Sequence, residues 1–596
     1  MAFRRHNLFV QRPQTILTLP RLTPALLLHT HHSITLPIPN TRRKSHVRYA
    51  VSSRNSTDPL LPRRSANYHP NIWDFEFVES LISDYKSEIC RNRAQKLREN
   101  VRAMFVGASG LQYSLKLIDT VQRLGLDYHF RSEIKSALDK IYNNGKDNHF
   151  SQDDLTIEAL RFRLYRQHGY EISQDVLKNF VEENNQNKGK VKDLEGLLSL
   201  YEASFYACEG EEILNEAQQV TTKHLKNCLK ERNDNRSNMS ISLEEEISHS
   251  LELPLLWRVP RMEVRRYINM YDMKPDMQPT LLELAKLYFN MVQATYHEEL
   301  KYASRWWRDL ALHESLSFAR NRLVECFFWN IGFNSEPEFG NLRKQMTKVC
   351  NLVTVIVDVY DVYGSLDELK MFTEAIQSGE IYVRHSWWKQ HGTTVVTYQY
   401  TDNAWITIAG PLVSVHAYSQ LGDQEIRREA FEYMNNNQSD LIRWSSMIFR
   451  LADDLATSKV YISSTFKLIL KFCIFFAIIL TCRCLCNYAD RIQKEQERGD
   501  VAKSIQCYMH ETGASESIAR QHVQHLISDA WEKMNTSLSA SRGVFPSSFI
   551  NIIQNIGRMG QYMYQYGDGY GTSNRESKDR IMSIIVNPIP VNKMGC

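Results

Sequence analysis

The sequence lacks a regular pattern of cysteines. Its eleven cysteines include no Cys-x-x-Cys pair, and the only dense group is "CRCLC" at 482–486. Scattered cysteines are typical of reduced thiols in a non-secretory compartment. Without a second pair of ligands, Cys-x-Cys-x-Cys is also poor support for a zinc site.

The sequence also lacks a hydrophobic run long enough for a membrane helix. The run at 472–480 holds nine apolar residues and follows Lys467 and Lys471, whereas a bilayer requires about 20. No apolar region followed by a clear cleavage site stands out near the amino terminus. We therefore expect no membrane partner.

Acidic residues are missing from the first 57 positions, which contain nine Lys or Arg and no Asp or Glu. This composition is typical of an organelle transit peptide. The rest of the chain is mildly acidic, with 63 basic and 68 acidic residues. That balance gives no sign of nucleic-acid binding.

Sustained β alternation and solenoid repeats are absent, and helical periodicity dominates from about residue 74. Apolar residues recur at i, i+3, i+4 and i+7 in 115–126, 155–169 and 193–204. Longer helices with more aromatics follow residue 270. The sequence predicts an all-α protein with two helical domains divided near 260–275.

Two short patterns carry chemistry. In "VTVIVDVYDVYGSLDEL" (353–369), read as a helix, Asp358 and Asp361 share one face. Buried carboxylates need a cation, and Mg²⁺ is a natural candidate, although a surface acidic pair is the alternative. Arg320 and Arg322, with Trp329 downstream, suit an anionic ligand with an apolar tail, unless they form a solvated helix face.

Ordered motifs over more than 500 residues then point to a family. They are "RRSANYHPNIW" (63–73), "ARNRLVE" (319–325), "VDVYD" (357–361), "RLADDLATS" (450–458), "GDVAKSIQCYMHETGASE" (499–516), "MYQYGDGYG" (563–571) and "IIVNPIP" (584–590). From about residue 63 to the carboxyl end, the chain resembles plant terpene synthases of the monoterpene-forming class.

The resemblance implies a vestigial N-terminal α-barrel over 58–265 and a C-terminal class I terpenoid synthase bundle over 266–596, after a transit peptide at 1–57. It implies that three Mg²⁺ or Mn²⁺ ions bind the diphosphate of a prenyl substrate, and that a carbocation forms. The implied metal ligands are Asp358, Asp361, Asp453, Thr457 and Glu495. The implied diphosphate-binding residues are Arg320, Arg322 and Arg450, and the cation-stabilising aromatics are Trp329, Tyr564 and Tyr570.

The tandem arginines Arg63 and Arg64, separated by eight residues from Trp73, resemble the family's active-site cap. In the family they accompany monoterpene synthesis, so the resemblance implies geranyl diphosphate as substrate and the plastid stroma as location. No DxDD sequence is present, and protonation-initiated chemistry is not expected. A monomer is the family expectation.

One departure from the family lies at Val357, where the aspartate-rich motif normally begins with Asp. That aspartate and the one at position 361 bridge two metals in the family, and valine cannot bind a metal. We therefore predict low or no activity for this chain. Arg320 and Arg322 form the family's Arg-x-Arg motif. Its middle residue is usually Asp and is Asn321 in this chain.

A second departure splits the other metal motif. Asp453 and Thr457 fit, but the position of the expected Glu is Tyr461. Removing residues 460–493 places Glu495 eight positions after Asp453, on the same helical face. The block begins with Val and ends with Gln, as a translated intron (GT…AG) does, so a retained intron is favoured over a tolerated insertion, a membrane anchor or a cysteine clip.

The leading hypothesis is a plastidial monoterpene synthase that releases a C10 olefin or alcohol and diphosphate. A catalytically inactive relative, a sesquiterpene synthase acting on farnesyl diphosphate, and a chain-elongating prenyltransferase are the alternatives. The last would need a second aspartate-rich motif.

Overall fold

The structure is a computed structural model that describes residues 71–144, 154–186, 193–233, 240–312, 316–359, 363–365, 368–369, 400–401, 404–406, 408–422, 425–435, 439–457, 503–568, 570 and 575–591. All of these belong to one compact unit, Arg63–Cys596. The described residues form helices joined by turns and loops, with no strand, which confirms the predicted all-α class.

Helices account for most of the described chain. The first ten are α1 (Phe75–Ser80), α2 (Glu88–Gly107), α3 (Leu111–Arg123), α4 (Arg131–Asn144), α5 (Leu155–His168), α6 (Lys178–Gln186), α7 (Leu194–Ser204), α8 (Glu212–Asn233), α9 (Ile241–Glu252) and α10 (Pro260–Asp272). Next come α11 (Pro279–Leu310), α13 (Leu323–Phe333), α14 (Gly340–Asp358), α17 (Gly410–Ser419), α18 (Arg428–Asn435), α19 (Asp440–Thr457), α22 (Ser504–Thr512), α23 (Glu516–Val544), α24 (Ser547–Tyr564) and α25 (Arg575–Ile581).

The helices predicted from periodicity are present as α3, α5 and α7. Local chemistry sets their ends. The Asp154 side chain accepts a hydrogen bond from the Ile157 backbone N–H at 3.1 Å and caps α5, and Asp193 caps α7 in the same way. Gly169, with φ of 81°, ends α5 in the left-handed conformation that favours glycine.

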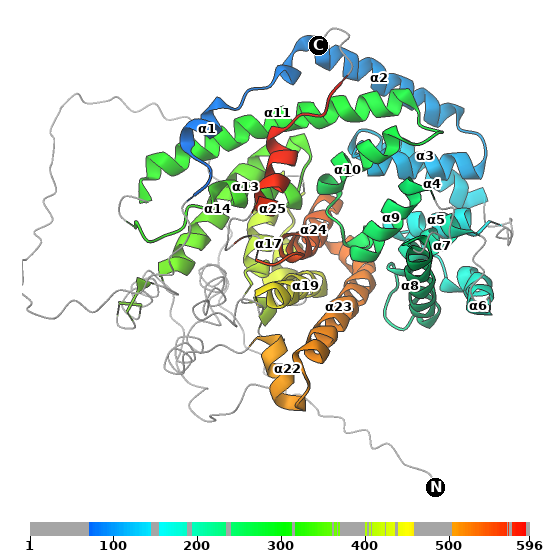
Figure 1. Ribbon diagram of the computed structural model, residues 1–596. Coiled ribbons are helices and arrows are strands. Elements are labelled where there is room, and N and C mark those ends of the chain that lie inside the picture. The colour runs from blue at the N-terminus through cyan, green and yellow to red at the C-terminus, as the bar shows by residue number, and fades with distance from the viewer. Residues whose placement is uncertain are drawn as a thin grey trace, which may run out of the picture. The chain divides into compact units, whose positions relative to one another are not determined.

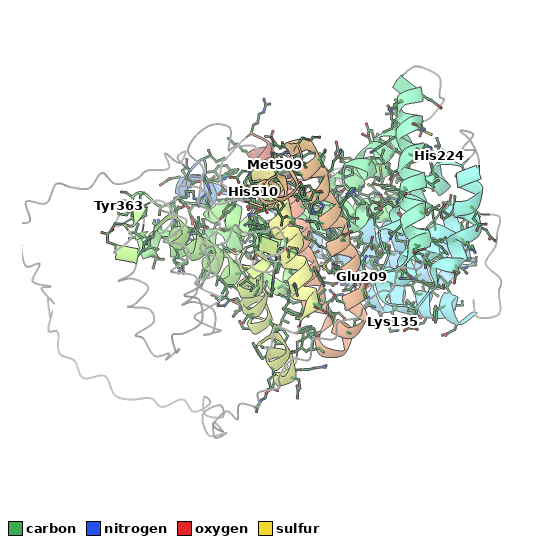
Figure 2. The ribbon with its side chains drawn as sticks, turned by 90° about the horizontal axis from the view of Figure 1, so that it is seen from below. Lys135, Glu209, His224, Tyr363, Met509 and His510 are labelled. Atoms are coloured by element: carbon green, nitrogen blue, oxygen red, sulfur yellow. The ribbon has the colours of Figure 1, made fainter. Side chains whose placement is uncertain are left out.

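Long helices organise the unit. The 32-residue α11 runs beside α1 and α2, and α19 packs against both α23 and α24 (Figure 1). The loop between α7 and α8 contacts α23, where the backbone N–H of Glu209 (labelled in Figure 2) donates to Thr536 Oγ1 at 2.9 Å. Trp257 and Trp531 stack nearby with ring centroids 5.7 Å apart. These contacts join α23 to the amino-terminal half of the chain.

The predicted domain boundary at 265–266 falls within α10, and it stays a prediction. Residues 1–57 and the block 460–493 lie outside the described residues. Among the described helices, none combines the length and apolar character needed to cross a membrane.

Candidate active site

Four helices that pack against one another carry most of the predicted site. Contacts join α13 to α14, α13 to α24, and α19 to α24. The predicted residues on or beside these helices are Arg320, Arg322, Trp329, Asp358, Arg450, Asp453, Thr457, Tyr564 and Tyr570. Asp361, Glu495, Arg63 and Arg64 lie outside the described residues.

Asp358 ends α14 and is fully buried. Its Oδ2 accepts the backbone N–H of Arg320 at 2.7 Å, and its Oδ1 accepts Arg320 Nε at 2.9 Å. Arg320 Nη2 lies 2.8 Å from the same Oδ1. Both carboxylate oxygens are therefore bound by Arg320, which gives Asp358 the role of an arginine partner in this conformation.

On α19, one buried guanidinium lies between two aspartates. Arg450 Nη2 donates to Asp453 Oδ2 at 2.6 Å, and its Nε donates to Asp454 Oδ1 at 2.9 Å. Asp454 also accepts hydrogen bonds from Tyr400 Oη and from the Ser504 backbone N–H. Asp454 is thus fully engaged, whereas in the described chain Asp453 Oδ1 accepts no hydrogen bond.

Thr457 lies one turn after Asp453, and its Oγ1 donates to the Asp453 carbonyl at 2.6 Å. Lys503 Nζ also hydrogen bonds to Thr457 Oγ1. Burial raises the pKa of the Asp453 carboxyl, and Arg450 and Lys503 oppose that shift. Lys503 had no predicted role, although it lies in the quoted segment "GDVAKSIQC".

Aromatic rings gather around Trp329. Its ring centroid lies 5.1 Å from that of Phe449, 6.3 Å from Tyr564 and 6.2 Å from Tyr570. Burial raises the pKa of both tyrosines, so their phenols stay neutral. The three predicted aromatics are therefore neighbours, and Phe449, one position before Arg450, joins them without having been predicted.

Trp73 is buried and packs on Phe77, with ring centroids 5.7 Å apart. A cavity of about 380 Å³ is lined by Trp73 together with Trp307, Asn321 and Leu323. The segment that follows the tandem arginines therefore shares a cavity with the middle residue of the Arg-x-Arg motif.

The oxygen donors of Asp453 and Thr457 suit a hard divalent cation such as Mg²⁺. Among the described residues, no three His, Cys, Asp or Glu side chains cluster closely enough to hold an ion. The fit is therefore partial. On α19, Asp453 offers one open oxygen and the Thr457 hydroxyl is bound by Lys503, whereas the carboxylate of Asp358 on α14 is bound to arginine.

Comparison with known proteins identifies the family. The model of the terpene synthase N-terminal domain matches residues 72–251, and that of the terpene synthase metal-binding domain matches 308–381, 378–465 and 463–533. Terpene synthase 10 of Ricinus communis is 41% identical, covering 90% of this chain and 100% of its own length. The chain belongs to the terpene synthase family.

This terpene synthase has further relatives of known name and structure. The chloroplastic myrcene synthase of Quercus ilex is 40% identical over 92% of this chain and 93% of its own length. A crystal structure of limonene synthase with 2-fluorolinalyl diphosphate superposes with a TM-score of 0.76 at 34% identity, covering 89% of this chain and 100% of that one.

A grey poplar isoprene synthase in complex with three Mg²⁺ ions and dimethylallyl-S-thiolodiphosphate gives a TM-score of 0.68 at 32% identity, covering 87% of this chain and 99% of that one. Terpene synthases are lyases that act on prenyl diphosphates with the help of a divalent metal. This chain is assigned to that class of enzyme.

Proposed function

We propose that this terpene synthase is a monoterpene synthase that ionises geranyl diphosphate and releases a C10 olefin or alcohol and diphosphate. The observation that supports the proposal most strongly is that a site of buried arginines and aspartates lies beside a pocket of neutral aromatic rings. The similarity to myrcene and limonene synthases over about nine-tenths of the chain supports the C10 substrate.

The cationic residues would receive the diphosphate. Arg450 is fully buried, and its Nη1 has no hydrogen-bond partner among the described residues. An unpaired guanidinium N–H is costly to bury, so an anion beside it would be stabilised. Arg320, Arg322 and Lys503 add positive charge, and guanidinium groups suit phosphate oxygens geometrically.

Asp361, Asp453, Thr457 and Glu495 would hold Mg²⁺ or Mn²⁺, with three ions in all. When bound, these ions would stabilise the negative charge that develops on the leaving diphosphate. Asp358 was predicted as a ligand too, but its hydrogen bonds favour a role in fixing Arg320. The arginines would also stabilise the departing diphosphate, because their positive charges are fixed beside it.

The aromatic residues would receive the hydrocarbon. Trp329, Tyr564 and Tyr570 present π faces that stabilise a cation. Because both phenols are neutral, neither adds a phenolate nucleophile to the pocket. Exclusion of water by these rings delays capture of the cation until the carbon skeleton has rearranged.

The location and the organisation of the chain belong to the same proposal. Relatives named chloroplastic support a plastid location, and we assign the stroma, a transit peptide at 1–57 and a monomeric state. Residues 58–265 would form the N-terminal helical domain and 266–596 the catalytic domain, with Arg63, Arg64 and Trp73 as its cap.

The block 460–493 would be absent from the working enzyme. The match to the metal-binding domain breaks at 378–381 and at 463–465. The second break lies inside this block, as an interruption there would produce. Sequencing transcripts across codons 459–494 tests the retained intron. A spliced message that lacks the block is expected, and transcripts that all keep it would overturn this part of the proposal.

Incubation of the chain without residues 460–493, beside the full chain, with Mg²⁺ and either geranyl or farnesyl diphosphate tests the function. A C10 product above the no-enzyme control from geranyl diphosphate is expected. Product from farnesyl diphosphate alone would reassign the chain to sesquiterpene synthesis. No product from either substrate, for a folded protein, would make it a catalytically inactive relative.

A further inference from the structure

The hydroxyl of Tyr570 is held by two helices. It lies 3.3 Å from Cys326 Sγ on α13 and hydrogen bonds to Thr354 Oγ1 on α14. Cys326 and Thr354 are both buried. A phenol that contacts two buried side chains on different helices has little freedom to turn.

The direction of these hydrogen bonds follows from counting protons. Thr354 Oγ1 donates to the Cys350 carbonyl at 2.9 Å, so its single proton is used and it accepts from Tyr570 Oη. Tyr570 Oη in turn accepts from the Cys326 thiol, which lies 3.3 Å from it and 4.0 Å from its other acceptor, Asn351 Oδ1. The chain of donors therefore runs from thiol to phenol to hydroxyl to carbonyl.

This arrangement has two chemical consequences. The donor chain ends at a backbone carbonyl, so Tyr570 cannot pass a proton onward through Thr354. Burial also raises the pKa values of Cys326 and Tyr570, which keeps thiolate and phenolate out of the pocket. Both potential nucleophiles are thus neutral and engaged.

The chain of hydrogen bonds also fixes a ring. The Tyr570 ring stands at 88° to the ring of Trp329, with centroids 6.2 Å apart. Thr354 lies one helical turn before Asp358, which binds Arg320. The clasp, defined as Cys326, Thr354 and Tyr570, therefore connects the aromatic pocket to the arginine end of the site.

We propose that Thr354 and Cys326 are positioning residues that hold the Tyr570 ring perpendicular to Trp329 and thereby set the ratio of terpene products. The proposal rests on the proposed function. A carbocation partitions among products according to the surfaces it meets, so a ring free to turn would change the ratio. The diphosphate-binding residues would be untouched.

The test compares Thr354→Val, Thr354→Ser and Tyr570→Phe in the chain without residues 460–493, supplied with geranyl diphosphate and Mg²⁺. Thr354→Val and Tyr570→Phe should shift the ratio of the two main products in the same direction by about threefold to tenfold, the scale of one hydrogen bond. Thr354→Ser keeps the hydroxyl and should keep the original ratio, and KM should stay within about twofold in the two Thr354 variants.

The matched control is Thr221→Val. Thr221 is fully buried and donates to the carbonyl four residues earlier, Ala217, at 2.7 Å, as Thr354 does to Cys350. It lies on α8 in the amino-terminal half of the chain. The product ratio should not change. An unchanged ratio in Thr354→Val would overturn the proposal while leaving the function intact.

A second measurement does not depend on turnover. Thr354→Val should lower Tm more in the wild-type chain than in Tyr570→Phe, where it should match Thr221→Val, because the phenol hydrogen bond is already gone. Equal Tm shifts in the wild-type chain and in Tyr570→Phe would show that Thr354 does not hold the Tyr570 hydroxyl. If the chain makes no terpene even without residues 460–493, the proposed function fails, and the comparison of Tm values still tests the contact between Thr354 and Tyr570.

Discussion

The helices α14 and α19 each bury an aspartate against an arginine, but they build the pair differently. On α14, Asp358 binds an arginine 38 residues away in sequence and takes its backbone N–H as well as its guanidinium. On α19, Arg450 lies within one turn of both Asp453 and Asp454 and is shared between them.

The difference shows which carboxylates remain open to a further cation. Asp358 and Asp454 each accept at least three hydrogen bonds, so their oxygens are committed to protein donors. Asp453 accepts one, from Arg450, among the described residues. Because Asp453 and Asp454 share one guanidinium, one oxygen of Asp453, beside Thr457, accepts no hydrogen bond among the described residues. On α14, by contrast, both oxygens of Asp358 accept hydrogen bonds from Arg320, and we call this pair closed.

The largest expected effect is at Asp453. Asp453→Asn keeps the shape but removes the charge of the open carboxylate, so kcat/KM with geranyl diphosphate should fall at least about 100-fold, at or beyond the upper end of the effects seen for outer-shell losses. Asp440→Asn, at the exposed first turn of the same helix, is the control and should change little. A similar loss of kcat/KM in both variants would show that the open carboxylate of Asp453 has no special role.

The next largest effect tests the missing carboxylate of α14. Val357 is buried beside Asp358, and Val357→Asp should raise turnover at least about tenfold and lower the Mg²⁺ concentration needed for half-maximal rate. Val357→Asn is equally polar but uncharged and should give no gain. No increase with Asp would show that the site does not need a carboxylate at position 357.

Asp358→Asn tests whether the pair on α14 is closed. It removes the charge of the carboxylate that binds the buried Arg320, so the free energy of unfolding in urea should fall by about 3–5 kcal/mol. The Mg²⁺ dependence of any remaining activity should be nearly unchanged. A shift in Mg²⁺ dependence as large as that of Asp453→Asn would make Asp358 a ligand after all.

A matched control for stability is the exposed pair of Arg428 and Glu432 on α18. Glu432→Gln removes the same kind of charge from a solvated pair and should change the free energy of unfolding by less than about 1 kcal/mol. The difference between the losses of unfolding free energy in this variant and in Asp358→Asn measures how much burial adds to the strength of an ion pair.

Periodicity and spacing predicted the helices and the shared face of Asp453 and Thr457, because both depend on local geometry along one helix. The commitment of Asp358 to Arg320 could not be predicted in the same way, since its donors come from a segment 38 residues earlier. Lys503 and Phe449 were missed for the same reason. Their neighbours are set by how α19 packs on α22 and α24.

The smallest expected effect is at Tyr400, whose hydroxyl donates to Asp454 at 2.9 Å. Tyr400→Phe removes one hydrogen bond to a charged group, so the free energy of unfolding should fall by about 1.5–3 kcal/mol, less than for Asp358→Asn, because Arg450 and Ser504 still bind the carboxylate. Tyr113→Phe, at an exposed tyrosine, is the control. The Mg²⁺ dependence should not change, since Asp454 is the committed member of its pair. A change there would mean that Tyr400 keeps Asp454 away from the metal, and α19 would then hold two open carboxylates instead of one.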